Sequence, residues 1–385
     1  MHATKVLEEA GRLMTVCNSC RYCEGVCAVF PAMELRKSFT DGDLNYLANL
    51  CHNCGACYDD CQYSPPHEFD VNVPAALAAV RVESYAAAAW PSALSGMFHR
   101  NGLAISIAAA LSVTVFVAGF VGLTDRHALF AKHSGPGAFY ELLPHDAMAA
   151  IFCAAFLYAA VACALSAKRF VASFGALRRD MTDPVAHARA TLASGSLRYL
   201  DGGGGGCADD GAHRVNLRKV FHHMTFYGFA LCFLATAVAT VYHYAFGREA
   251  PYAVDDLPVL LGTLGGIGLI VGPIGLLVAK RLRDPAVVSK ASYGMDVAFI
   301  VMLLLTGATG MILLAARDTA AMGALLALHL GVVFGLMITM PYGKFIHGLF
   351  RYLALARYER ERIVVANGAF SAVDDPPSAA ATLGS

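Results

Sequence analysis

The chain contains 12 cysteines, and eight of them form an internal repeat within the first 61 residues. The same spacing, Cys-x2-Cys-x2-Cys-x3-Cys, occurs twice with an offset of 34 residues. Its members are Cys17, Cys20, Cys23, Cys27, Cys51, Cys54, Cys57 and Cys61. Three thiolates at this spacing can bind one iron–sulfur cube from a tight loop, whereas the fourth reaches the neighbouring cube. The repeat therefore predicts two [4Fe–4S] clusters that exchange one ligand each.

The predicted ligand sets cross between the two motifs. They are Cys17, Cys20, Cys23 and Cys61 for one cluster, and Cys51, Cys54, Cys57 and Cys27 for the other. A proline usually follows the fourth cysteine directly, whereas Pro31 and Pro65 come four residues later. Zinc is the alternative metal, but it does not require the third and fourth cysteines of each motif. No role is predicted for the remaining four, which are Cys153, Cys163, Cys207 and Cys232.

Four histidines in apolar surroundings form the second candidate site, because neutral imidazoles are the axial ligands of b-type haem. His329 and His347 are 18 residues apart, which is about five helical turns and roughly 27 Å along one face. His222 and His243 are 21 residues apart, about 60° from alignment on a helix. His223 falls nearly opposite His243, so His222 is preferred as a ligand. No Cys-x-x-Cys-His motif for covalent haem attachment occurs.

Six apolar segments must position these histidines. The chain is 57% hydrophobic and only 15% charged, below the about 25% charged residues of soluble domains. Each segment can cross a bilayer core of about 30 Å as a helix, and none shows the alternation of barrel strands. The predicted spans are residues 103–123, 147–167, 220–246, 257–279, 297–316 and 320–342, and they contain no Asp or Glu.

The distribution of basic residues predicts that both termini are cytoplasmic. The connection at 168–219 holds nine Lys and Arg, whereas the segments assigned outside hold four: Arg126, Lys132, Arg248 and Arg317. This topology places His222 and His347 near the cytoplasmic face, and His243 and His329 nearer the outer face. The sequence therefore predicts an inner haem held by His222 and His347, and it leaves open whether His243 and His329 hold a second, outer haem. The alternative is that such histidines cap helix ends or lie at headgroup level, as we expect for His223, His99 and His145.

These elements divide the chain into three predicted parts. Residues 1–98 form a cytoplasmic, all-helical ferredoxin-like domain that is acidic, with six Lys/Arg and eleven Asp/Glu. Residues 99–358 form a six-helix transmembrane bundle with a cytoplasmic loop at 168–219, and residues 359–385 are predicted to be disordered. The glycine run at 201–207 is typical of a linker. Pro341 should bend the sixth helix, and Lys344 is expected to extend to the membrane interface.

Two segments and the order of the motifs carry a family resemblance. FHHMTFYG at 221–228 and PYGKFIHG at 341–348, together with the cysteine motifs and six spans, resemble the tricarballylate/citrate-utilisation protein B family over residues 10–360. The segment with His329 and His347 is also similar to the haem helix of respiratory nitrate reductase gamma subunits. The resemblance implies a bacterial inner-membrane protein that reoxidises the FAD of a partner dehydrogenase acting on tricarballylate or a similar tricarboxylate. Electrons would pass through the clusters and b-type haem to quinone.

The sequence also excludes some function classes and leaves two alternatives open. The chain shows no substrate site or nucleotide fingerprint of its own, since the GGIG run at 265–268 lies in a span and is typical of helix packing. Its zero net charge excludes a nucleic-acid binder driven by bulk charge. One alternative is the membrane subunit of another redox complex, either heterodisulfide-reductase-like or formate-linked. The other is a non-redox, zinc-containing membrane transporter.

Overall fold

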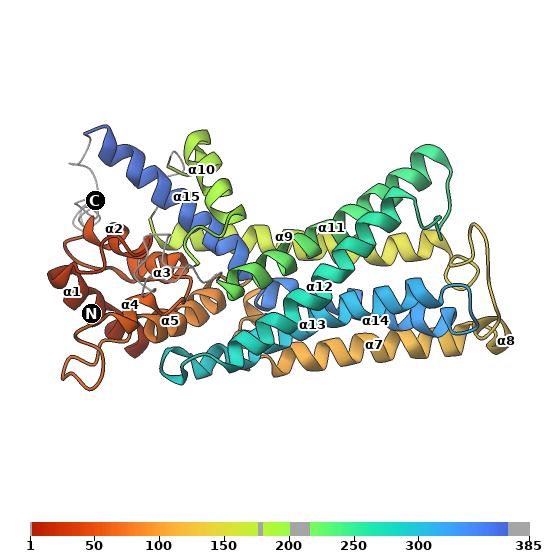
Figure 1. Ribbon diagram of the computed structural model, residues 1–385, viewed down its shortest axis with the longest axis horizontal. Helices are drawn as coiled ribbons and strands as arrows, with labels where there is room; N and C mark the ends of the chain where they lie inside the picture. The colour runs from red at the N-terminus through yellow and green to blue at the C-terminus, as the bar shows by residue number, and fades with distance from the viewer. Residues whose placement is uncertain (1, 176–179, 201–215, 369–385) are drawn as a thin grey trace, which may run out of the picture.

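The structure, a computed structural model, describes residues 2–175, 180–200 and 216–368. Within these ranges every regular element is a helix, which confirms the predicted all-α fold class. The cysteine-rich part lies at one end of the long axis, and the long apolar helices run away from it along that axis (Figure 1). We call residues 2–88 the head and the long apolar helices the bundle.

Five helices build the head: α1 (Lys5–Cys20), α2 (Val29–Glu34), α3 (Asp41–Leu50), α4 (Ala56–Asp59) and α5 (Val73–Ala88). Thr4 caps α1 by accepting a hydrogen bond from the amide of Leu7, and Thr40 and Asp43 form a capping box at α3. The apolar faces of these helices meet in a core that includes Leu13, Leu47 and Leu77, all fully buried. This core fixes the two cysteine motifs, which begin in the last turn of α1 and directly after α3.

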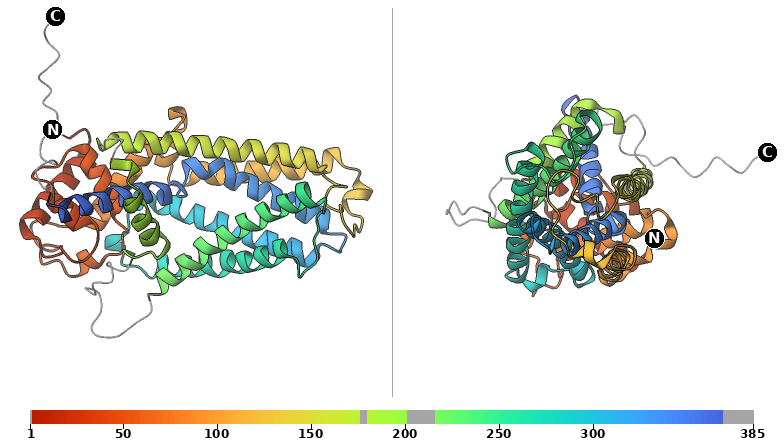
Figure 2. Two further views of the ribbon diagram at one scale, coloured as in Figure 1. Left: turned by 90° about the horizontal axis from the view of Figure 1, so that it is seen from above. Right: turned by 90° about the vertical axis from the view of Figure 1, so that its right-hand side faces the viewer.

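Six helices are long and apolar enough to cross a membrane. They are α7 (Leu103–Leu123), α9 (His145–Ser173), α11 (Leu217–Phe246), α12 (Leu257–Arg281), α13 (Lys290–Ala316) and Met322–Tyr342, which joins α14 (Met322–Thr339) to the short helix η5 (Met340–Tyr342). Their outward faces leave large apolar side chains uncovered by protein, such as Leu111 and Val115 on α7. Such faces suit contact with lipid. The chain is therefore a multi-pass membrane protein, with the helices side by side along one axis (Figure 2).

Short helices connect these elements: η1 (Ser92–Leu94), α6 (Gly96–His99), α8 (Arg126–Leu129), η2 (Asp180–Thr182), α10 (Pro184–Gly195) and η4 (Pro285–Val287). The predicted loop at 168–219 is thus partly helical, because α9 continues to Ser173 and α10 follows. The predicted glycine linker at 201–207 lies outside the described residues, and so does Cys207.

Helices α11 and α12 pack backbone to backbone along a seam of glycines. A Cβ at Gly268 would lie 2.7 Å from the carbonyl oxygen of Met224, and one at Gly228 would lie 2.9 Å from the carbonyl oxygen of Gly265. Small residues allow membrane helices to approach this closely and to gain dispersion energy along their length. The packing role predicted for the glycine run at 265–268 is confirmed.

Replacing Gly268 by alanine should therefore destabilise the bundle by about 1–3 kcal/mol, because the new methyl group overlaps the Met224 backbone. The matched control is Gly119→Ala on α7, where an added Cβ meets nothing within 4 Å. Thermal unfolding of both variants in detergent measures the difference. Equal melting temperatures would contradict the close packing of this seam.

The chain leaves the sixth span at Pro341 and turns back toward the head. Helix α14 ends at Thr339, and α15 (Ile346–Ala366) begins after η5, so the predicted bend at Pro341 is confirmed. As a result His329 and His347 lie on different helices, and the straight-helix spacing inferred for them does not apply. The predicted boundary of a disordered tail at residue 359 is also wrong, because α15 runs to Ala366. Residues 369–385 lie outside the described ranges.

Buried ion pairs join α15 to the head. Arg36 in the head donates to Glu361 Oε1 at 2.6 Å and to Asp43 Oδ1 at 2.7 Å. The hydroxyl of Tyr46 donates to Glu361 Oε2 at 2.9 Å. Buried charges persist in proteins when each is paired and hydrogen-bonded. The hydrophobicity pattern did not register the helical segment 359–366 because its buried residues include Glu359 and Glu361.

Candidate functional site

The cysteine motifs lie in two loops whose shape depends on backbone turns. Arg21 follows Cys20 with φ 56°, and Asn53 precedes Cys54 with φ 52°. Both residues adopt the left-handed region, which reverses the chain between successive cysteines. Gly55 then adopts φ 105° at the start of α4, where a side chain would be strained. These turns fold each motif into a compact loop.

The structure brings the cysteines together in the crossed arrangement. The thiol of Cys17 interacts with Cys20, Cys23 and Cys61, and burial together with these neighbours raises its pKa to about 12. The thiol of Cys27 interacts with Cys51 and Cys54, and its pKa is likewise raised, first by burial. Crossed ligation requires this proximity of the fourth cysteine of each motif to the other motif. The ligand assignment itself stays a prediction.

The first set, Cys17, Cys20, Cys23 and Cys61, lines a shallow cavity near the surface of the head. Cys57 and apolar side chains such as Phe30 and Val71 complete its wall. Tyr22 beside it is 69% exposed. Within the part of the chain that the structure describes, no three His, Cys, Asp or Glu side chains converge as one metal ion would require.

The inner histidines face each other where the head meets the bundle. His222 on α11 and His347 on α15 have ring centroids 6.3 Å apart and planes at 74°. His347 Nδ1 donates to the carbonyl oxygen of Lys344, which leaves Nε2 for another partner. His222 Nδ1 is buried without a hydrogen-bond partner. Burial, followed by the charges of Lys344 and Arg351, holds the pKa of His347 well below its usual range, so this imidazole is neutral.

The outer histidines are not brought together. His243 stacks on His145, with ring centroids 3.6 Å apart and planes at 17°. His329 Nδ1 hydrogen-bonds to Thr309 Oγ1 at 2.9 Å. Among the described residues no ring contact joins His243 to His329. The contact between His145 and His243 was missed, because His145 was expected only to cap a helix or lie at headgroup level.

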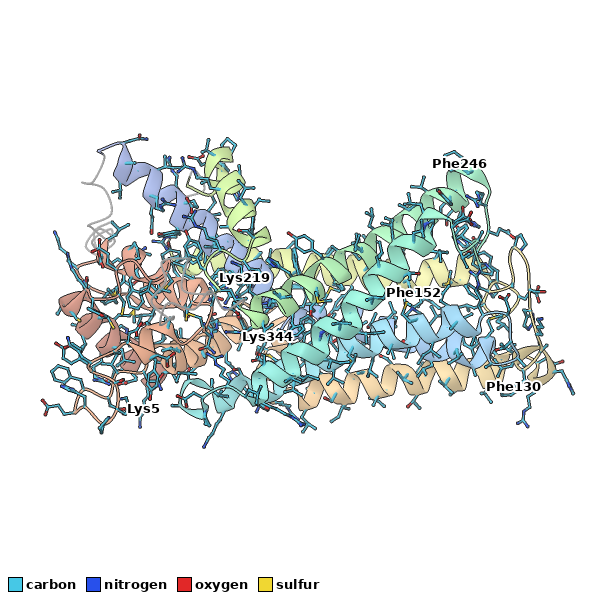
Figure 3. The ribbon with its side chains drawn as sticks, viewed as in Figure 1. Lys5, Phe130, Phe152, Lys219, Phe246 and Lys344 are labelled. Carbon is cyan, nitrogen blue, oxygen red and sulfur yellow. The ribbon has the colours of Figure 1, made fainter. Side chains whose placement is uncertain are left out.

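A partly buried triad of charges near His347 was also missed. Asp296 on α13 pairs through Oδ1 with Lys344 Nζ at 2.8 Å and through Oδ2 with Lys280 Nζ at 2.7 Å. Lys344 therefore does not extend to the interface as expected. Figure 3 shows Lys344 and Lys219 beside the head, with Phe130 and Phe246 at the opposite end of the bundle. The sequence signal for the triad was three charged residues at the head-side ends of consecutive spans. The predicted fifth span began at residue 297, so it left out Asp296 by one position.

Comparisons with known proteins cover most of the chain. Residues 96–368 match the family model for citrate utilization protein B, and residues 10–87 match the Fer4-like domain of that protein. The chain is 47% identical over 362 residues to a citrate utilization protein B of Escherichia coli, a match that covers 92% of each chain. No solved structure matches it. The cysteine-rich head and the six-span bundle are thus both accounted for, and the chain belongs to the citrate utilization protein B family.

Proposed function

We propose that this protein is a membrane electron carrier that reoxidises the FAD of a partner dehydrogenase and delivers the electrons to quinone. The dehydrogenase would act on tricarballylate or a similar tricarboxylate, since the chain is similar to citrate utilization protein B. Its cofactors would be two [4Fe–4S] clusters, held as Cys17, Cys20, Cys23 and Cys61 and as Cys51, Cys54, Cys57 and Cys27, and b-type haem. A flavin hydroquinone gives up two electrons and two protons, and quinone takes up the same number of each.

One observation carries this proposal: the loop of the second cysteine set accepts hydrogen bonds from Arg218 and Arg351, which lie one helical turn from His222 and His347. His52 stands between Cys51 and Cys54, is buried, and interacts electrostatically with His222. Two imidazole nitrogens bound to one metal ion at about 2 Å each place their rings about 6 Å apart, close to the 6.3 Å between His222 and His347. His222 and His347 are therefore spaced so that they would hold one iron between their imidazole nitrogens.

The roles of the residues follow from these contacts. When bound, the clusters and the haem supply one-electron redox chemistry. Cys17 and its set hold the cluster at the exposed end of the head, where a partner flavoprotein can approach. The carbonyl of Lys344 fixes the tautomer of His347 and leaves its Nε2 as the ligand atom. His222 offers the second nitrogen from α11.

We also propose that the head and both termini face the cytoplasm of a bacterium whose inner membrane holds the bundle. Lys280, Arg283 and Lys344 lie at the inner ends of the spans, next to the head, and the positive-inside rule assigns such residues to the cytoplasm. Head cysteines then remain reduced and available to iron. A reporter fused after residue 368 that is active only in the cytoplasm tests this orientation, and activity in the periplasm would overturn it.

Quantitation of iron, acid-labile sulfide and haem on one anaerobically purified sample tests the cofactors. We expect about eight iron and eight sulfide per chain outside the haem. Replacing Cys51 by serine should remove about half of both, because it deletes a predicted ligand of only one cluster. The matched control, Cys153→Ser, replaces an exposed cysteine with no predicted role and should leave both contents unchanged. Finding about two zinc and little iron would favour a non-redox transporter instead.

A further inference from the structure

We infer that Arg218, Arg283 and Arg351 form a cationic clamp on the loop at residues 49–53. The clamp raises the reduction potential of the cluster held by Cys27, Cys51, Cys54 and Cys57 above that of the other cluster. This inference rests on the proposed function, because it requires both clusters. It concerns the order of the reduction potentials of the two clusters. Neither the family match nor the ligand pattern determines this order.

The clamp consists of three guanidinium groups that contact the loop from α11, from the segment after α12 and from α15. Arg218 on α11 donates to the carbonyl oxygens of Asn53 at 2.9 Å and His52 at 3.3 Å. Arg283, which follows α12, donates to the same Asn53 carbonyl at 2.5 Å. Arg351 on α15 donates to the carbonyl of Cys51 at 2.7 Å. The backbone of this cysteine loop is therefore held by side chains far away in the sequence.

A fourth arginine supports the loop from within the head. Arg81 on α5 is buried and donates to the carbonyls of Ala48 and Cys51, both at 2.9 Å. The charges act on the thiols as well as on the backbone, since Arg283 interacts electrostatically with Cys51 and Cys54, and Arg351 with Cys51. The second cysteine set thus lies among several cations.

Among the described interactions of Cys17, in the first set, there is no cation. The groups that act on Cys17 are the other thiols of its own set, Cys20, Cys23 and Cys61. Arg21 lies in this motif, but its side chain is exposed and donates back to the carbonyl of Asn18 at 3.1 Å. Glu24 and Glu34 lie near Arg21 and offset its charge. Asp59, in the second motif, lies near Arg283 and offsets part of its charge. Arg81, Arg218 and Arg351 still donate hydrogen bonds to the loop of this motif, so the second set has the more positive surroundings.

The sign of the effect follows from electrostatics. Reducing an iron–sulfur cluster adds one electron and hence one negative charge, so nearby fixed cations favour the reduced form and raise the potential. Burial alone would act in the opposite direction, because a low-dielectric site disfavours added charge. The clamp supplies the compensating charge at short range, where solvent screening is weak. Electron transfer from the exposed set to the set beside His222 is consequently favourable.

A redox titration followed by electron paramagnetic resonance tests the clamp on the purified, anaerobically handled protein. Cys17→Ser and Cys51→Ser assign each signal to its cluster, because each alters one of them. We expect the signal altered by Cys51→Ser to titrate at the higher potential. In Arg283→Gln the equilibrium constant for reducing that cluster should fall about tenfold, which is ~59 mV for one electron, while the other cluster is unchanged.

Two further variants separate charge from structure. Arg351→Lys keeps the charge and should retain most of the potential, whereas Arg351→Gln should lower it at equal iron and sulfide content. The matched control is Arg12→Gln, which removes an exposed head arginine paired with Glu9 and should shift neither signal. A higher potential for the Cys17 set, or arginine variants that shift both signals equally or not at all, would overturn the clamp. If neither cluster signal is present in the unaltered protein, the proposed function fails instead.

Discussion

Replacing His347 by alanine is expected to abolish the b-type haem spectrum, and His222→Ala should have the same effect. Each variant leaves one axial imidazole where two are required, and the two rings lie 6.3 Å apart across the predicted site. Absorption spectra of membranes before and after reduction by dithionite measure the loss. We expect at least a tenfold decrease in haem at equal protein, with the iron and sulfide of the head retained.

The matched control is His99→Ala, which replaces an exposed histidine at the end of α6 and should leave the haem content unchanged. His329→Ala decides the number of haems, because His329 contacts Thr309 and not His243. If the chain holds one haem, this variant keeps the full spectrum, whereas a second haem would be lost with it. A normal spectrum in both His222→Ala and His347→Ala would refute the inner site.

Replacing Asp296 by asparagine should destabilise the bundle by about 3–5 kcal/mol, because it leaves Lys280 and Lys344 as neighbouring charges without their common counter-ion. The carboxylate bridges the two ammonium groups at the head-side end of the bundle, where all three side chains are partly buried. Chemical unfolding in detergent, followed by circular dichroism, measures the change. A second effect is expected on the haem spectrum, because the carbonyl of Lys344 orients His347.

The matched control for Asp296 is Glu9→Gln, which breaks an exposed ion pair with Arg12 on the head. Such surface pairs contribute about 0–1 kcal/mol, so the two variants should differ clearly. If Asp296→Asn unfolds at the same denaturant concentration as Glu9→Gln, the triad does not stabilise the bundle. The double variant Asp296→Asn with Lys280→Met should recover part of the loss, since it removes one of the two uncompensated charges.

The sequence predicted the spans well and the helix ends less well, for a physical reason. Helix α7 begins and ends at the predicted residues because Gly102 and Thr124 bound an apolar run. Helix α13 begins at Lys290, seven residues before the predicted start, because hydropathy detects contact with lipid and not the helical turns that continue beyond it. Asp296 lies in that extension, so the absence of Asp and Glu from the predicted spans concealed it.

The two histidine pairs show how far the predicted position of a residue across the membrane can identify its partner. For His222 and His347, their predicted position at the same depth in the membrane was sufficient to predict that the two side chains lie close together. The partner of His243 also depends on how α9 and α11 are rotated about their axes, which the sequence does not specify, and the structure places His145 there. The contacts of the arginines with the cysteine loop could not be predicted from the sequence either. Arg218, Arg283 and Arg351 are more than 150 residues away in the chain from the carbonyls to which they donate.

Helix α15 connects the head to the predicted haem site. It carries His347 in its first turn and Glu361 near its end, where Glu361 is bound to Arg36 of the head. His347 and Glu361 are 14 positions apart, which corresponds to about 21 Å of helix, and a helix does not change its length as a flexible linker does. Because electron tunnelling weakens steeply with distance, a fixed spacer sets a fixed rate. Helix α15 therefore sets a fixed distance between the head and His347, the predicted haem ligand.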